Sequence, residues 1–209
     1  SIHNANIASG CRGNVHVLRL PSNDIHSLRG LQDFTRLLWL DVSSNDLRSL
    51  NGIGCATALT MLDISNNDLC GQDACKQLAQ CAALEWLNVA NNDLTTLGTC
   101  LPSSLRYLNA SSNDLSNVNA ILDLRKLECL DLSNNCLQIL LPENFVGRLP
   151  AIKTIAFGHN GLQGPSTAET VTTIVRGGVL EALRHHTWPT ISTMPRSPNN
   201  QQLVWIGLY

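Results

Sequence analysis

The sequence predicts an α/β solenoid in which short parallel strands form a curved sheet on the concave face, with short helices or 3-10 turns on the convex face. First, a frame of the form L-x-x-L-x-L-x-x-N-x-L recurs along the chain. Second, its apolar positions alternate as in a strand with one buried side. Third, most frames begin only about 22 residues after the previous one, which leaves room for little more than a turn on the return path. The asparagines of the seven frames are Asn23, Asn45, Asn67, Asn92, Asn113, Asn135 and Asn160.

This frame is the sequence signature of a leucine-rich repeat, in which each coil holds one strand and one return segment. The chain therefore resembles the leucine-rich repeat family over about residues 15–165. The fourth frame illustrates the geometry that the resemblance implies. Leu87 and Val89 should point into the coil, whereas Trp86 and Asn88 should point out of the sheet. Asn92 should bond the backbone of the turn from coil to coil, because an amide carries both donors and an acceptor.

The repeat boundaries divide the chain into three parts. Residues 1–14 are small and polar and are predicted to be a lead-in, and residues 15–165 form seven coils. The third return segment, residues 72–83, lacks Pro and Gly and is predicted to form a helix on the convex side. Residues 166–209 contain a predicted helix over 170–184, a proline-rich stretch and the apolar segment 203–209. We expect this segment to cap the last coil or to dock onto a neighbouring molecule.

Composition bounds the compartment and the partners. A net charge of −2 offers no broad basic surface for nucleic acid. No apolar run approaches the roughly 20 residues that span a membrane. The cysteines are scattered through the repeats and are not clustered at the ends, which favours buried free thiols in a reducing compartment. We therefore expect an intracellular chain, most simply cytoplasmic, with the cilium, cytoskeleton or nucleus as alternatives. The eight are Cys11, Cys55, Cys70, Cys75, Cys81, Cys100, Cys129 and Cys136.

The outward strand positions supply the candidate site. We call the residues just before the inner strand Leu the aromatic column and the residues just after it the polar column. Aromatic and Met side chains in a row resemble the anchors of protein interfaces, and an acidic column favours a partner with a basic patch. The alternative is that the aromatic rings only pack on each other, since strands favour aromatic residues. The candidate partner-binding residues are Trp39, Met61, Trp86 and Tyr107 in the aromatic column, and Arg19, Asp41, Asp63, Asn88, Asn109 and Asp131 in the polar column.

Within the family, the 22-residue period and the S-x-N-D-L turns resemble the intracellular class of protein phosphatase 1 regulatory subunits. Related members include the spliceosomal A-prime protein, tubulin-folding cofactors and axonemal dynein light chains. The resemblance implies a non-catalytic scaffold or regulatory subunit that binds a partner protein on its concave face. The usual C-terminal cap of that class is not recognisable in residues 166–209. The alternative function is a structural component of a large assembly, such as an axoneme, a microtubule or a ribonucleoprotein.

An enzyme, or the substrate-recognition arm of one, is the third hypothesis. His185 and His186 are adjacent, and adjacent helical residues diverge by about 100°, so a shared metal is not expected. Cys70, Cys75 and Cys81 do not have zinc-site spacing and no suitable His follows them. Phosphate-loop, nucleophile-elbow and zincin motifs are absent from the sequence. We therefore expect no catalytic residues, cofactor, metal or small-molecule substrate.

Overall fold

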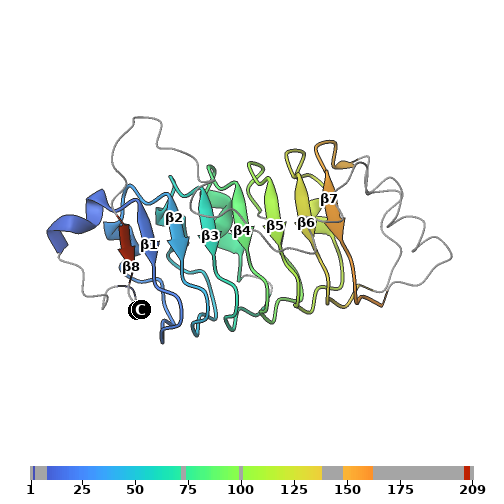
Figure 1. Ribbon diagram of the computed structural model, residues 1–209, viewed down its shortest axis with the longest axis horizontal. Coiled ribbons are helices and arrows are strands. Elements are labelled where there is room, and N and C mark those ends of the chain that lie inside the picture. The colour runs from blue at the N-terminus through green and yellow to red at the C-terminus, as the bar shows by residue number, and fades with distance from the viewer. Residues whose placement is uncertain are drawn as a thin grey trace.

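The computed structural model describes residues 2, 9–71, 74–98, 101–137, 148–161 and 205–207. Parallel three-residue strands, one in each of the seven coils, lie side by side in chain order in an open, curved sheet (Figure 1). An eighth strand pairs with the first. The strands are β1 (Val17–Arg19), β2 (Trp39–Asp41), β3 (Met61–Asp63), β4 (Trp86–Asn88), β5 (Tyr107–Asn109), β6 (Cys129–Asp131), β7 (Thr154–Ala156) and β8 (Trp205–Gly207).

Strand register follows the frame without slippage. Leu62 is the partner of Leu40 on one side and of Leu87 on the other, so the inner position of each coil lies beside the inner position of the next. A shift of one residue would turn every inner Leu outward, which is why the apolar pattern fixes the register. The predicted α/β solenoid and the alignment of its outward columns are confirmed.

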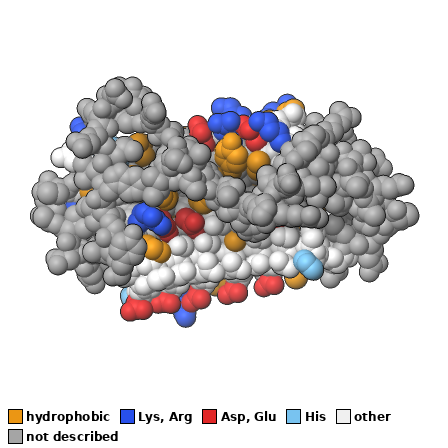
Figure 2. All heavy atoms as spheres, in the orientation of Figure 1, with side chains coloured by type: hydrophobic (Ala, Val, Ile, Leu, Met, Phe, Trp, Pro, Cys, Tyr) orange, Lys and Arg blue, Asp and Glu red, His pale blue; other side chains and the backbone are white. Residues whose placement is uncertain are grey.

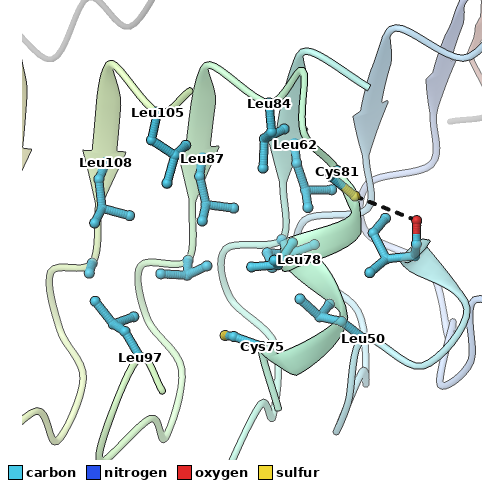
Figure 3. Close-up of a cluster of buried hydrophobic side chains, with 14 of the residues drawn as sticks. Leu50, Leu62, Cys75, Leu78, Cys81, Leu84, Leu87, Leu97, Leu105 and Leu108 are labelled. Atoms are coloured by element: carbon cyan, nitrogen blue, oxygen red, sulfur yellow. Dashed lines mark hydrogen bonds between the residues drawn. The ribbon is translucent and has the colours of Figure 1, made fainter. Parts of the chain in front are cut away.

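Inward side chains fill the space between the sheet and the return segments. Leu62, Leu87 and Leu108 come from three consecutive strands and point the same way, with Leu78 and Leu97 beneath them (Figure 3). All five are buried. Because each coil also buries its leucines against the neighbouring coils, stability depends on the stack and not on a single coil.

The helices whose bounds lie within the described residues are 3-10 helices. Their bounds are η2 (Ser9–Asn14), η3 (Leu31–Asp33), η4 (Ile53–Cys55), η5 (Lys76–Gln80) and η6 (Asn119–Ile121). The prediction of a regular helix over residues 72–83 was wrong, because η5 is a 3-10 helix and covers only part of that range. The N–H groups of Leu78 and Cys81 bond the carbonyls of Cys75 and Leu78, each three residues earlier and at 3.0 Å. A 3-10 helix rises about 2.0 Å per residue against 1.5 Å in an α-helix, which carries the chain back to the next strand in fewer residues.

The predicted asparagine ladder is present. Asn67 donates from Nδ2 to the carbonyls of Val42 and Ile64, both at 3.1 Å, and its Oδ1 accepts the N–H of Leu47 at 2.9 Å. One amide therefore satisfies backbone groups in its own coil and in the coil before it. The same arrangement recurs at Asn45, Asn92, Asn113, Asn135 and Asn160.

A left-handed residue precedes each of these asparagines. Its φ lies between 52° and 56° in all seven frames, where most side chains are disfavoured. The turn between the strand and the ladder requires this conformation, and Asn, Ser and His at these positions are short enough to adopt it. The seven residues are Ser22, Ser44, Asn66, Asn91, Ser112, Asn134 and His159.

The first coil is closed by elements from both ends of the sequence. Ile2 is buried in the core, and Arg12 of η2 bonds Asp33 at 2.8 Å. β8 runs parallel to β1 on the edge opposite β2. The expectation that the apolar segment would cap the last coil was therefore wrong in its location, since residues 205–207 pair with the first. The predicted helix over 170–184 and the histidine pair lie outside the described residues.

Candidate partner-binding surface

The strands place the two outward columns. In β2, Leu40 points into the coil, so Trp39 and Asp41 on either side of it point from the opposite, concave face. The pairing of β2 to β5 puts Met61 beside Trp39 and Trp86 beside Tyr107. The aromatic column therefore exists as predicted, with its members one strand spacing apart.

Exposure within the aromatic column differs from the prediction. Trp39 and Tyr107 are half-buried, but Met61 and Trp86 are each only 6% exposed. The two buried side chains nevertheless stand apart from the leucine core of the coils. Each of the two has a large side chain of the column on both neighbouring strands, whereas Trp39 and Tyr107 have Val17 and Cys129 on one side. The expectation of an exposed row of four was wrong, and only the two ends of the row are accessible.

Each accessible ring carries an arginine. The guanidinium of Arg19 lies 5.2 Å from the ring centroid of Trp39, and that of Arg106 lies 5.6 Å from the ring of Tyr107. Both distances fit a cation–π contact. Arg19 also donates from Nε to Asp41 Oδ2 at 3.1 Å. The two rings are therefore held in place by their neighbours before any partner arrives.

Most side chains of the polar column accept hydrogen bonds from the turn that follows their own strand. Asp41 Oδ1 accepts the backbone N–H of Ser43 at 3.1 Å and its hydroxyl at 2.7 Å, closing the turn after the strand. The acceptor at this position needs no charge, because Asn and Asp both occur there. Most of the column is buried, so the expected acidic row for a basic partner is much less open than predicted. Equivalent bonds are made by Asp63, Asn109 and Asp131 to the Ser two residues later and by Asn88 to Ala90.

Asp63 has a perturbed titration. Burial raises its pKa, while bonds from the Ser65 hydroxyl and N–H oppose the rise and the charge of nearby Asp41 adds to it. Asn88 donates to its second oxygen at 3.3 Å. An ionised carboxylate is thus less favourable here than in water, although its hydrogen bonds are satisfied.

Charges of alternating sign line the strand edge before the aromatic column. Glu128 lies between Arg106 and Lys153, accepting from Arg106 Nε at 2.7 Å and from Lys153 Nζ at 2.5 Å. Arg106 Nη1 also lies 3.7 Å from Glu85 Oε2. The bond from Lys153 and then that from Arg106 lower the pKa of Glu128, and the bond to Glu128 raises the pKa of both cations. This charge ladder ties four coils together, so these charges already have partners within the chain.

The sequence reasoning missed an acidic edge. The residue after the ladder asparagine is an exposed Asp in each of the first five coils, and these carboxylates form a row along one side of the solenoid (Figure 2). The signal for it is the Asp of the S-x-N-D-L turns, which recurs at a fixed frame position. The acidic edge comprises Asp24, Asp46, Asp68, Asp93 and Asp114.

The described residues contain no group of three or more His, Cys, Asp or Glu side chains that could hold a metal ion. Burial raises the pKa of Cys75 to about 12 and that of Cys81 to about 11, so both thiols are neutral at physiological pH. Cys81 donates to the carbonyl of Ile53 at 3.6 Å (Figure 3). None of the helices in the described ranges is long and apolar enough to cross a membrane.

Residues 126–147, around Asn135 of the sixth frame, match the family model of the leucine-rich repeat. The same frame and turn recur in register through seven coils, and the asparagine ladder runs through the second to the seventh. The chain has the fold of a leucine-rich repeat solenoid. A leucine-rich repeat protein of Leptospira interrogans is similar over 81% of this chain and 50% of its own, with a TM-score of 0.68 and 26% identity.

Two further solved structures have the same fold. An internalin (InlF) of Listeria monocytogenes matches with a TM-score of 0.63 and 23% identity, covering 75% of this chain and 45% of its own. A plant peptide hormone receptor, RGFR1, in complex with RGF2 matches with a TM-score of 0.61 and 28% identity. The match covers 74% of this chain and 26% of the receptor chain. This solenoid thus spans half or less of these three structures. A search of curated protein sequences found no significant match.

Proposed function

We propose that this solenoid is a non-catalytic scaffold that binds a partner protein on its concave face. The observation that carries the proposal is the pair Trp39 and Tyr107. Both are half-buried, both lie on the outward side of the sheet, and each is braced by a stacked arginine. Large, rigid side chains that are held in place lose little entropy on binding, and Trp and Tyr dominate interface energies for this reason.

Met61 and Trp86 form the floor between the two rings. Being buried, they gain little further contact from a partner, but they fix the spacing of the rings that flank them. The partner we propose therefore spans β2 to β5 and inserts apolar groups beside each accessible ring. The receptor complexed with RGF2 supports a protein or peptide partner for a solenoid of this fold.

We propose a basic patch on the partner. The acidic edge supports it, because five exposed carboxylates lie in a row on one side of the solenoid, even though Arg48 Nε lies 4.0 Å from Asp68 Oδ2. The charge ladder on the other side is neutralised within the chain and adds little to it. Exposed charges of this kind act chiefly on the association rate and specificity, so binding should weaken as salt rises.

The 22-residue period and the dispersed cysteines support an intracellular regulatory subunit of the class that resembles the protein phosphatase 1 regulators. The cysteines of the described coils are free, including exposed Cys70 and Cys136. Unpaired exposed thiols fit a reducing compartment.

A quantitative affinity purification tests the proposal. Proteins retained by the wild-type chain are compared with those retained by Trp39→Ala, by Tyr107→Ala and by Lys126→Ala, the last being an exposed control in the turn before β6. Candidate partners are then titrated against each variant. Each aromatic variant should lose about 30-fold in affinity, or roughly 2 kcal/mol, while the control keeps the wild-type value. Equal affinity for all four folded chains would contradict the concave site.

A further inference from the structure

The outer edge of β1 differs from the other strand edges near it. β2 through β6 are each paired on both sides by the strands of neighbouring coils. β1 is the first strand of the stack, so one of its edges has no neighbouring coil, and unpaired N–H and C=O groups there would form a template for another strand. β8 occupies this edge, parallel to β1, with Trp205 opposite Val17, Ile206 opposite Leu18 and Gly207 opposite Arg19.

The sequence around β8 repeats the strand frame. Residues 203–208 read L-V-W-I-G-L, residues 37–42 read L-L-W-L-D-V, and residues 84–89 read L-E-W-L-N-V. Register places Trp205 in the aromatic column and Ile206 in the inner position. Trp205 and Ile206 therefore stand where β2 has Trp39 and Leu40, whereas Gly207 stands where β2 has Asp41. This strand is 188 residues further along the chain than β1.

The connection permits pairing within one molecule. β7 and β1 are six strand spacings apart, or about 29 Å. The 43 residues 162–204 reach at most about 140 Å. Tethering of this kind gives the segment an effective concentration of about a millimolar at its own edge, which favours pairing within one chain over pairing between chains in dilute solution.

We propose that the outer edge of β1 is a docking site for an extended strand of the frame L-x-x-L-x-L, and that residues 205–207 of the same chain occupy it. Main-chain bonds supply the affinity, and alternate positions of the frame supply the specificity, as in other cases of strand addition. The segment closes the first coil against self-association at its edge. This inference does not depend on the partner proposed for the concave face.

The test uses the full chain with Trp205→Pro and Ile206→Pro together. Consecutive N–H groups of a strand point to opposite edges, so the double change removes one ladder donor whichever residue supplies it. The matched control carries the same two prolines at Gln201 and Gln202, outside the paired residues. Hydrogen exchange is measured for the amides of β1 and of residues 205–207. Binding is measured with a labelled peptide of residues 203–209 bearing two added lysines for solubility.

We expect the β1 amides that face β8 to exchange at least about tenfold faster in the proline variant than in the wild type and the control. The peptide should bind the proline variant at least about tenfold more tightly than the other two, whose edge is already filled. Unprotected 205–207 amides in the wild type would overturn the proposal, even if the variant fails to fold. Equal peptide binding to all folded chains would overturn it too. A wild-type mass that grows with concentration, while the variant stays monomeric, would replace pairing within one chain by pairing between copies.

Discussion

Asn92 holds the fourth coil to the third through both ends of its amide. Its Oδ1 accepts the N–H of Leu69 at 2.9 Å, and its Nδ2 donates to the carbonyl of Ile64 at 3.1 Å. Asn92→Leu keeps a similar volume but leaves buried backbone groups in two coils without partners. We expect the free energy of unfolding to fall by about 1–3 kcal/mol, measured by urea denaturation.

Asn23 provides the control for that prediction. It stands at the same frame position but in the first coil, where it is exposed, and within the described part of the chain its amide bonds the nearby carbonyl of Pro21, at 2.8 Å. Asn23→Leu should change stability by less than about 0.5 kcal/mol, as most exposed substitutions do. If both variants lose the same stability, the ladder does not stabilise the fold in the way described.

The contrast between these two asparagines also indicates what sequence reasoning can reach. Strand register, inward leucines and the ladder were predictable, because a pattern with a fixed period leaves only one way to bury its apolar side. The burial of Trp86 was not predictable in this way. It depends on Met61 and Tyr107, which lie beside Trp86 on the neighbouring strands, and not on the frame position of Trp86 itself. The pairing of β8 was missed for a related reason: it joins segments far apart in the chain, where no local period operates.

Asp63→Asn should stabilise the solenoid at neutral pH. The amide oxygen can accept the same two bonds from Ser65, as Asn109 does from Ser111, without burying a charge. We expect a gain below about 1 kcal/mol in the free energy of unfolding. Asp63→Ala, which removes the acceptor, should instead destabilise the fold.

The pH dependence of that gain has a definite sign. Burial raises the pKa of Asp63 in the folded state, so folding takes up a proton between the unfolded and folded pKa values. Above both pKa values, ionised Asp63 lowers the free energy of unfolding. As the pH falls between the two values, Asp63 becomes protonated in the folded state and this destabilisation disappears. The gain from Asp63→Asn should therefore shrink as the pH falls through the folded pKa, and it should be gone below the ordinary value of 3.8. A difference that stays constant from pH 7 to pH 3 would contradict the raised pKa.

Trp86 and Trp39 should separate stability from binding. Trp86 is 6% exposed, so Trp86→Ala leaves a cavity beside Met61 and should cost about 3 kcal/mol of unfolding free energy. Trp39→Ala removes a half-buried ring and should cost only about 1 kcal/mol while weakening partner binding. Thermal unfolding of the two variants, with the partner titration described above, checks both effects. Equal losses of stability would mean that the two rings have the same role.

The buried thiols should make the solenoid sensitive to alkali. Burial raises the pKa of Cys75 to about 12 and of Cys81 to about 11, above the ordinary value of 9.0. Between about pH 9 and pH 11 the unfolded chain loses these protons while the folded chain keeps them, so stability falls as pH rises. In Cys75→Ala with Cys81→Ala, the melting temperature should decline less steeply over this range. Cys70 and Cys136, which are exposed, provide the matched pair whose replacement should leave the slope unchanged.

Glu128 should stabilise the fold through the charge ladder, and this stabilisation should be lost at low pH. Its side chain is 12% exposed, whereas those of Arg106 and Lys153 are 42% and 66% exposed, so solvent screens the pairs. We therefore expect Glu128→Gln to cost about 1 kcal/mol at pH 7 and less in high salt.

The contribution of Glu128 should also depend on pH. The bond from Lys153, followed by that from Arg106, lowers the pKa of Glu128 in the folded state from its usual 4.5. The stabilisation by Glu128 is therefore present above pH 4.5 and is lost as the pH falls through the folded-state pKa. Chemical denaturation of both chains at pH 7 and pH 3 measures this. Glu85→Gln, which removes only the 3.7 Å contact with Arg106, should have a smaller effect at either pH, and an equal effect would assign the stabilisation elsewhere.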